Sequence, residues 1–190
     1  PNNPKPGDIK FKDLNEDGVI NSEDRTMVEG VYPKMLYSFN LNFGYKDFDL
    51  SLFFQGVEGR KIWTNFFGED PFSQGASPNK KFLNAWTPEN TDTNVPALYA
   101  WGYAPMCNTR STYNLKDASY LRLKNLQLGY NVPIRYLSKL GISFLRVYFS
   151  GENLFTITDY PDYDPEREGD GWHVQYPQAK TYSLGINLKF

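Results

Sequence analysis

The chain contains 190 residues with 20 basic and 22 acidic side chains, a formal net charge of -2 and a single cysteine, Cys107. This balance, without a basic cluster, argues against a nucleic-acid partner, whose phosphates require grouped Lys and Arg side chains. The lone Cys107 excludes an intrachain disulfide, and the lone His173 excludes a histidine cluster for a metal.

The hydropathy of the sequence is compatible with a membrane protein only if strands, and not helices, cross the membrane. No apolar run approaches the roughly 20 residues that a membrane-spanning helix needs. The mean hydropathy is -0.58, but polar lumen-facing and loop residues lower this value in β-barrels. Any crossing is therefore expected to use strands of about 9 to 11 residues.

The chain opens with a loop and a hairpin. Residues 1–33 begin with a proline-rich stretch and show no signal peptide, so the chain is expected either to be cytosolic or to begin inside a longer mature protein. The strand patterns that follow favour the second. Apolar side chains then occupy every second position over Met35–Tyr45 and again over Phe48–Phe54. The residues between them, Lys46-Asp47, form a predicted tight turn. The pattern indicates two antiparallel strands with one shared apolar face.

A long segment without a sustained period follows at about residues 57–116 and is rich in Gly, Pro, Asn and Thr. It predicts one long loop with at most a helical turn. Its aromatic side chains have three open interpretations: a small core of the loop itself, contact with a partner protein, and stacking on a sugar ring. The candidate contact residues, of which the last lies in a later loop, are Trp63, Trp86, Trp101, Tyr103 and Trp172.

Alternation resumes in the last third of the chain. Tyr120–Tyr130 predicts a strand in which Arg122 and Lys124 share a face with Leu126, and Leu145–Phe155 predicts another. Residues 158–177 form a loop whose acidic side chains are expected to be solvated, namely Asp159, Asp162, Asp164, Glu166, Glu168 and Asp170. The segment 178–190 then alternates strictly and ends on an aromatic residue, an arrangement that resembles the terminal strand of outer-membrane proteins.

Long and short connections alternate along the chain, as they do in outer-membrane barrels, which have short periplasmic turns and long extracellular loops. We therefore predict an all-β fold: about five antiparallel strands forming the C-terminal portion of a transmembrane β-barrel, with the C-terminus in the periplasm. Residues 1–33 would be an extracellular loop, and residues 34–190 would supply the barrel strands and their loops. Five strands cannot close a barrel, so the chain is expected to be part of a longer one.

Two soluble alternatives share this strand pattern. One is a calcium-stabilised β-sandwich that binds carbohydrate, and the other is an accessory domain of a secreted hydrolase. They differ from a barrel in what the apolar faces meet, because sandwich faces pack on each other whereas barrel faces meet lipid. The sequence contains no Gly-rich phosphate loop, no Ser nucleophile elbow and no metal-binding histidine pair, so no enzyme is predicted.

The segment from Asp13 to Asp24 fits a twelve-residue calcium loop. Gly18 occupies position six, where the chain must turn sharply. Asp24 replaces the usual Glu at position twelve, and its shorter side chain is expected to weaken binding. The alternative is a turn held by the hydrogen bonds of its own Asx side chains. The predicted ligands are Asp13, Asn15, Asp17, Val19 through its carbonyl, Asn21 and Asp24, and the predicted role of calcium is structural.

Several strings of residues, in order, resemble one family, the SusC/RagA-type TonB-dependent outer-membrane transporters of Bacteroidetes. Each string alone is weak, but together they extend over nearly the whole chain with suitable spacing. They are GDIKFKDLNEDGVI at 7–20, FDLSLFFQG at 48–56, WTPEN at 86–90, ASYLRLKN at 118–125, LRVY at 145–148, GENLFT at 151–156 and YPQAKTYS at 176–183.

The resemblance implies a 22-stranded barrel in the outer membrane with an N-terminal plug. It further implies energy supplied by the TonB complex through an N-terminal part absent from this chain, and a SusD-like surface lipoprotein that covers the barrel. The implied function is import of oligosaccharides, with peptides as the alternative within the same family. The implied partners are the rest of the barrel and plug, the lipoprotein, the TonB complex and outer-membrane lipid. The fold alone does not identify the substrate.

Overall fold

The computed structural model describes residues 4–63, 77–78, 80–99, 111–161, 164–166 and 176–190. These residues belong to two compact units, the loop unit (residues 1–29, 61–116 and 168–175) and the sheet unit (residues 30–60, 117–167 and 176–190). In the described part of the chain, no helix is long and apolar enough to cross a membrane. The sheet unit contains β1 (Met35–Tyr45), β2 (Phe48–Glu58), β5 (Tyr120–Asn131), α1 (Ile134–Leu137), η5 (Ser138–Leu140), β6 (Phe144–Thr158) and β7 (Thr181–Lys189).

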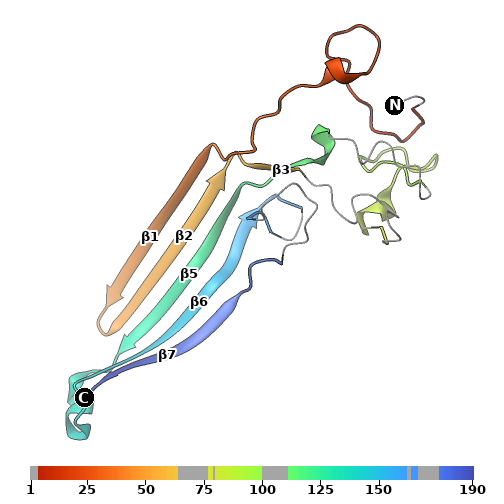
Figure 1. Cartoon of the computed structure of the whole chain (residues 1–190). Coiled ribbons are helices and arrows are strands. Elements are labelled where there is room, and N and C mark those ends of the chain that lie inside the picture. Colours follow the sequence, from red (N-terminus) through yellow and green to blue (C-terminus); the bar gives the residue numbers. More distant parts are fainter. Residues whose placement is uncertain (1–3, 64–76, 79, 100–110, 162–163, 167–175) are drawn as a thin grey trace. The chain divides into compact units, whose positions relative to one another are not determined.

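The sheet unit is one antiparallel sheet of five strands in the order β1-β2-β5-β6-β7 (Figure 1). Neighbouring strands of this sheet are antiparallel and follow one another in chain order, except that β3 (Lys61–Trp63) and β4 (Leu115–Asp117) lie in the connection between β2 and β5. Strand β1 begins at Met35 and ends at Tyr45, and the Lys46-Asp47 turn follows, as the hairpin pattern predicts. The prediction of about five antiparallel strands is thus confirmed.

The register of the sheet separates an apolar face from a polar face. One row of paired residues crosses all five strands and contains Phe43, Leu50, Leu128, Phe149 and Leu184. The adjacent row points to the other face and contains Asn42, Ser51, Gln127, Ser150 and Ser183. Alternation with a period of two residues therefore holds in three dimensions as well as in the sequence.

The apolar face is exposed to a degree that a soluble sheet avoids. Among its side chains, Phe43 is 57% exposed, Leu184 83% and Ile186 67%. These side chains form one contiguous face, because their rows are paired across neighbouring strands. A large exposed apolar surface indicates contact with a protein or a membrane.

The predicted face of Arg122 is wrong. Strand β5 contains a register shift between Leu123 and Asn125, opposite Phe53 and Phe54 of β2, which leaves Lys124 as an additional residue in the strand. A β-bulge of this kind reverses the alternation on one side of it. Arg122 therefore pairs with Gln55 on the polar side, and Leu123 pairs with Phe54 on the apolar side.

The loop unit contains η1 (Ser22–Asp24), β3 (Lys61–Trp63), η3 (Lys80–Asn84), η4 (Thr112–Asn114) and β4 (Leu115–Asp117), the last ending at the boundary of the sheet unit. Strands β3 and β4 pair with each other within the segment that the sequence predicts as loop. Gly7, which has a φ of +88°, lies against the ring of Trp86, and its carbonyl accepts a hydrogen bond from Ala97 N at 2.9 Å. Ile62, Phe82, Ala85 and Ala97 are buried.

Candidate functional site

The predicted calcium loop is held by hydrogen bonds of its own side chains. The carboxylate of Asp13 accepts from the backbone N–H groups of Glu16 at 2.7 Å and Gly18 at 2.8 Å. The carboxylate of Asp24 accepts from Leu14 N at 2.7 Å and Asn21 N at 2.8 Å. Asp24 thereby connects the start of the loop to its end.

The conformation at the centre of the loop has the features expected of the motif. Gly18 has a φ of +82°, which a glycine adopts at little cost. Asn21 caps η1 and forms a capping box with Asp24. The backbone N–H groups of Asn21 and Leu14 lower the pKa of Asp24 below its ordinary value, which keeps this carboxylate ionised at neutral pH.

These contacts agree with the Asx-rich turn, and calcium stays a prediction. Within the described ranges, no three His, Cys, Asp or Glu side chains are grouped so that they could hold a metal ion. The carboxylate of Asp17 accepts two hydrogen bonds, one from Val19 N at 2.7 Å and one from Asn15 Nδ2 at 2.9 Å. A carboxylate oxygen that accepts one hydrogen bond retains a second lone pair.

Among the predicted aromatic contacts, the structure describes only Trp63, at the end of β3, and Trp86; Trp101, Tyr103 and Trp172 lie outside the described residues. Trp86 lines a shallow cavity of about 350 Å³ together with Asp8, Thr93 and Tyr113. Tyr99 donates a hydrogen bond from its hydroxyl to Asp8 Oδ1 at 2.7 Å. The ring of Trp86 thus packs on the backbone of Gly7 and also borders a cavity with polar groups.

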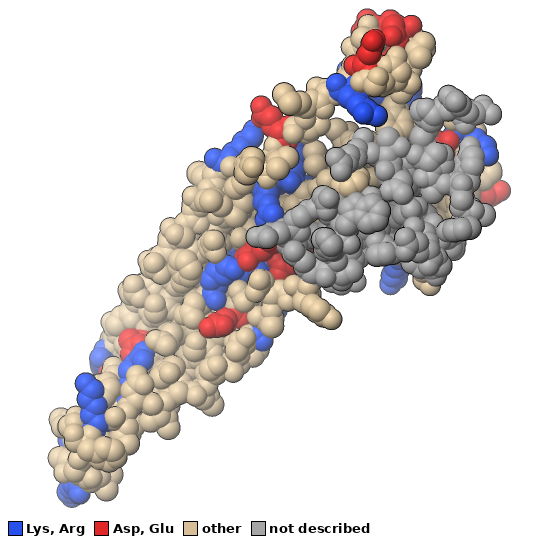
Figure 2. Space-filling model, in the orientation of Figure 1, with Lys and Arg blue, Asp and Glu red and all other residues tan. Residues whose placement is uncertain are grey.

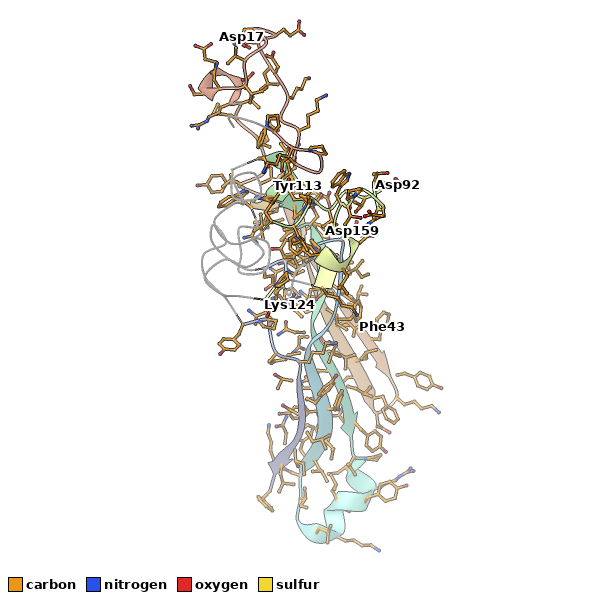
Figure 3. The ribbon with its side chains drawn as sticks, turned by 90° about the vertical axis from the view of Figure 1, so that its right-hand side faces the viewer. Asp17, Phe43, Asp92, Tyr113, Lys124 and Asp159 are labelled. Carbon is orange, nitrogen blue, oxygen red and sulfur yellow. The ribbon has the colours of Figure 1, made fainter. Side chains whose placement is uncertain are left out.

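A buried charge cluster lies on the polar face of the sheet unit, and the sequence analysis missed it. Arg122 donates to Asp164 Oδ1 at 2.8 Å and to Thr156 Oγ1 at 2.7 Å. Lys124 Nζ lies 2.7 Å from Glu166 Oε2. The side chains of Arg122 and Asp164 are 5% and 9% exposed, so Asp164 is not solvated as predicted. Figure 3 shows Lys124 and Phe43 on opposite sides of the strands.

Asp164 holds its loop in place through several hydrogen bonds. It accepts hydrogen bonds from Glu166 N at 2.9 Å and from Gln178 N at 2.8 Å, just before β7. Arg60 donates to the carbonyl oxygen of Pro165 at 3.1 Å. Burial by itself raises the pKa of Asp164, but the hydrogen bonds from Arg122, Gln178 and Glu166 together lower it below its ordinary value. Asp164 therefore binds its loop to the polar face in its ionised form.

A second ion pair crosses the polar face near the opposite end of the strands. Asp49 of β2 accepts from Arg146 Nε of β6 at 3.1 Å, and Arg146 also contacts Gln127 Oε1 at 3.3 Å. The strand between them contributes Gly129, where a Cβ atom would lie 2.5 Å from Arg146 Nη2 and 2.6 Å from Asp49 Oδ1. The absence of a side chain at Gly129 lets the two charges meet. Figure 2 shows acidic and basic groups next to each other over the strands.

A signal for the missed cluster is present in the sequence. The leucines of β5 change from odd positions, Leu121 and Leu123, to even positions, Leu126 and Leu128. Such a change of phase within one strand indicates a bulge, which would have placed Arg122 on the polar face. The partner Asp164 lies 42 residues further along the chain, and nothing in the spacing of the loop identifies it.

The chain is similar to known proteins in sequence and in structure. No family model matches it. It is 37% identical over 197 residues to TonB-dependent receptor P3 of Formosa agariphila, covering 97% of this chain and 19% of that protein. It is 29% identical over 191 residues to TonB-dependent receptor SusC of Bacteroides thetaiotaomicron, covering 99% of this chain and 18% of SusC. The chain thus spans about a fifth of the length of these relatives.

A solved structure agrees with these matches in both fold and sequence. The RagAB peptide importer in the closed-closed state superposes with a TM-score of 0.75 at 34% identity, covering 90% of this chain and 19% of that chain. Sequence similarity along nearly the whole chain therefore coincides with the same arrangement of strands. The chain belongs to the SusC/RagA-type TonB-dependent receptors and corresponds to a segment of their β-barrel.

Proposed function

We propose that this chain forms part of the wall of an outer-membrane transporter that imports a nutrient with energy from the TonB complex. The observation that supports the proposal is the row Phe43, Leu50, Leu128, Phe149 and Leu184, which continues across five strands. Strands of 9 to 15 residues have the length needed to cross a hydrocarbon layer when tilted. The polar face would line the lumen, and no catalytic step is part of the proposal.

The localisation is tested on the full-length receptor that contains this chain. It is expected in the outer-membrane fraction, to require detergent for extraction, and to change its gel mobility on heating, as folded barrels do. The C-terminus is proposed to lie on the periplasmic side, which a protease-accessible tag placed after Phe190 would report. A receptor that stays soluble without detergent would contradict the proposal and support the β-sandwich alternative.

We propose an oligosaccharide as the substrate class and a SusD-like lipoprotein as the cover of the barrel, since the resemblance to the SusC/RagA-type family implies both. The similarity to the RagAB peptide importer favours a peptide as the second candidate. Calorimetric titration of the full-length receptor with a panel of neutral oligosaccharides and a panel of short peptides separates the two. Binding confined to the peptides would overturn the oligosaccharide assignment, and co-purification with a lipoprotein tests the partner.

We also propose that the loop from Asp13 to Asp24 binds calcium and is made rigid by it. In support, its side-chain oxygens are the hard donors that calcium prefers, Asp24 is kept ionised, and Gly18 has the required positive φ. Calcium titration of the full-length receptor should show one site that the Asp13→Ala variant loses. Absence of binding at millimolar calcium would leave the Asx-rich turn as the complete explanation of the motif.

We propose that Trp86 contacts a bound partner, because it lines a cavity together with Asp8 and Thr93. A flat ring beside carboxylate and hydroxyl groups suits either a substrate or the lipoprotein that covers the barrel. Trp86→Phe keeps a ring to pack on Gly7 and Trp86→Ala does not. Weaker uptake or cover binding with both variants would favour direct contact, whereas a defect confined to the alanine variant would favour packing of the loop.

A further inference from the structure

The end of the sheet that carries the short turns is rich in exposed basic groups. It comprises the Lys46-Asp47 turn, the segment Ile134–Leu140 with α1 and η5, and the end of β7 (Figure 1). The basic side chains Lys46, Arg135, Lys139 and Lys189 are all exposed. Asp47 is the only acidic residue in these three segments. Figure 2 shows basic groups at this end of the strands.

Each of the three segments pairs a cation with an aromatic ring. Lys46 Nζ lies 5.2 Å from the ring centroid of Tyr45, and Arg135 Cζ lies 4.8 Å from that of Tyr136. Lys189 Nζ lies 5.8 Å from the ring of Phe144. Aromatic rings and long basic side chains are the groups that proteins place at the level of lipid headgroups.

The α1 and η5 segment is anchored on one side and exposes apolar groups on the other. Leu137 is only 3% exposed, and its carbonyl accepts from Ile142 N at 3.4 Å. Ile134 and Tyr136 are each 59% exposed and Leu140 is 69% exposed. A turn in water gains nothing from exposing three large apolar side chains beside two basic ones, whereas this composition suits a segment at a membrane interface.

The apolar face of the sheet is continuous with this end. Phe48 begins β2 directly after the Lys46-Asp47 turn, and its ring lies 4.7 Å from that of Tyr130 near the end of β5. Tyr45 is 71% exposed and Phe48 is 51% exposed. The basic groups therefore stand at the margin of the surface that would meet hydrocarbon, where phosphate groups of phospholipids lie.

We propose that Lys46, Arg135 and Lys189, each beside an aromatic ring, form together with Lys139 a cation–aromatic collar that binds the phosphates of anionic phospholipid headgroups. The inference rests on the proposed function, because it requires the apolar face to be in a membrane. The cations supply charge attraction to the phosphates, and Tyr45 and Tyr136 supply rings that lie at headgroup depth. The expected ligand class is a glycerophospholipid with a net negative charge, such as phosphatidylglycerol.

The test uses the full-length receptor in nanodiscs that contain phosphatidylcholine and phosphatidylglycerol, with the lipids that remain bound counted by native mass spectrometry. The wild-type receptor is expected to retain phosphatidylglycerol preferentially. Loss of two charges in R135Q/K139Q should reduce that preference about tenfold or more, since each basic group near an anionic surface contributes appreciably. The charge-conserving variant R135K/K139R should keep it.

The control K10Q/K12Q removes two exposed basic groups from the loop unit and should leave the preference unchanged. An unchanged preference in R135Q/K139Q, with normal heat-dependent mobility, would overturn the collar. An equal loss in K10Q/K12Q would also overturn it, because net charge alone would then explain the preference. Failure of the wild-type receptor to insert would overturn the proposed function and the collar together, whereas insertion without lipid preference overturns the collar alone.

Discussion

The sheet unit and the loop unit are stabilised by different kinds of contact. In the sheet unit, the same pairing repeats from strand to strand, as in the row that contains Phe43 and Leu184. The hydrogen bonds between paired strands satisfy the backbone N–H and C=O groups. In the loop unit, individual contacts determine the conformation. Examples are the hydrogen bond from Gly18 N to the carboxylate of Asp13 and the packing of the Trp86 ring against Gly7. A repeated pattern can be read from sequence, and single long-range contacts cannot.

The two units also differ in what their apolar side chains do. The sheet unit exposes large apolar groups on one face and concentrates its buried polar contacts, Arg122 with Asp164, on the other. The loop unit buries Ile62 and Phe82 in a small core of its own, while its exposed apolar side chains, such as Met27 and Leu83, are scattered and do not form rows on one sheet face. Substitutions that act on one kind of contact should therefore leave the other unit intact.

The largest expected effect comes from Arg122→Met. It leaves the buried carboxylate of Asp164 without its cation, which costs about 3 to 5 kcal/mol in other proteins. Thermal unfolding of the full-length receptor in detergent should report the loss, and protease cleavage within residues 158–177 should increase. Arg25→Met, at an exposed position of the loop unit, is the control. Equal stability of the two variants would show that the charge cluster contributes nothing to the sheet unit.

Gly129→Ala should have the next largest effect. The new Cβ would lie 2.5 Å from Arg146 Nη2, so the ion pair with Asp49 must open or the strands must shift, at about 1 to 3 kcal/mol. Gly44→Ala is the matched control in the same sheet, because no atom lies within 4 Å of its Cβ position. If both substitutions shift the unfolding temperature equally, strand propensity and not the ion pair explains the effect.

Gly7→Ala tests the loop unit in the same way. Its Cβ would lie 2.6 Å from Trp86 Cε3, and its φ is +88°. Gly18→Ala shares the positive φ, at +82°, but meets no atom within 4 Å. For Gly7→Ala alone, the opening free energy for amide hydrogen exchange over residues 85–97 should fall by roughly 1 to 3 kcal/mol, so that exchange there becomes faster. An equal fall over residues 13–24 in Gly18→Ala would attribute the loss to backbone strain instead of ring packing.

The smallest effect under ordinary conditions concerns pH. The pKa of Asp164 is lowered in the folded protein, so its stabilising contribution is fully present above the ordinary value of 3.8 and is lost as the pH falls through the lower folded value. Protection of residues 158–177 from protease should thus persist at neutral pH and decline only below about pH 4. Asp164→Asn should remove this dependence. Decline that begins near pH 6 would indicate another titrating group.

The sequence predicted the sheet well because its information is local and repeated. The bounds of β1 and the turn at Lys46 follow from alternation alone, and the same holds for the position of β7 near the end of the chain. The face of Arg122 was wrong because one additional residue, Lys124, reversed the phase within β5. A bulge of one residue hardly changes the composition of the strand, but it moves every side chain beyond it to the opposite face of the sheet.

The candidate sites were less predictable for the same physical reason. The Asx motif at residues 13–24 was identified because its contacts span only a few residues. Asp164 reaches Arg122 across 42 residues, and Tyr99 reaches Asp8 across 91, so neither pair leaves a local pattern. The pairing of β3 with β4 inside the expected loop is likewise a contact between distant segments.

One face of the sheet is proposed to meet lipid and the other to meet water. The most direct measurement places single spin labels at successive positions of β7 and of β5 in the full-length receptor, with Cys107 replaced by Ser, and compares relaxation by oxygen and by a water-soluble nickel complex. Labels at Leu184, Ile186 and Leu128 should be accessible to oxygen, and labels at Ser183, Asn187 and Gln127 to nickel. Uniform accessibility to nickel on both faces would contradict the account.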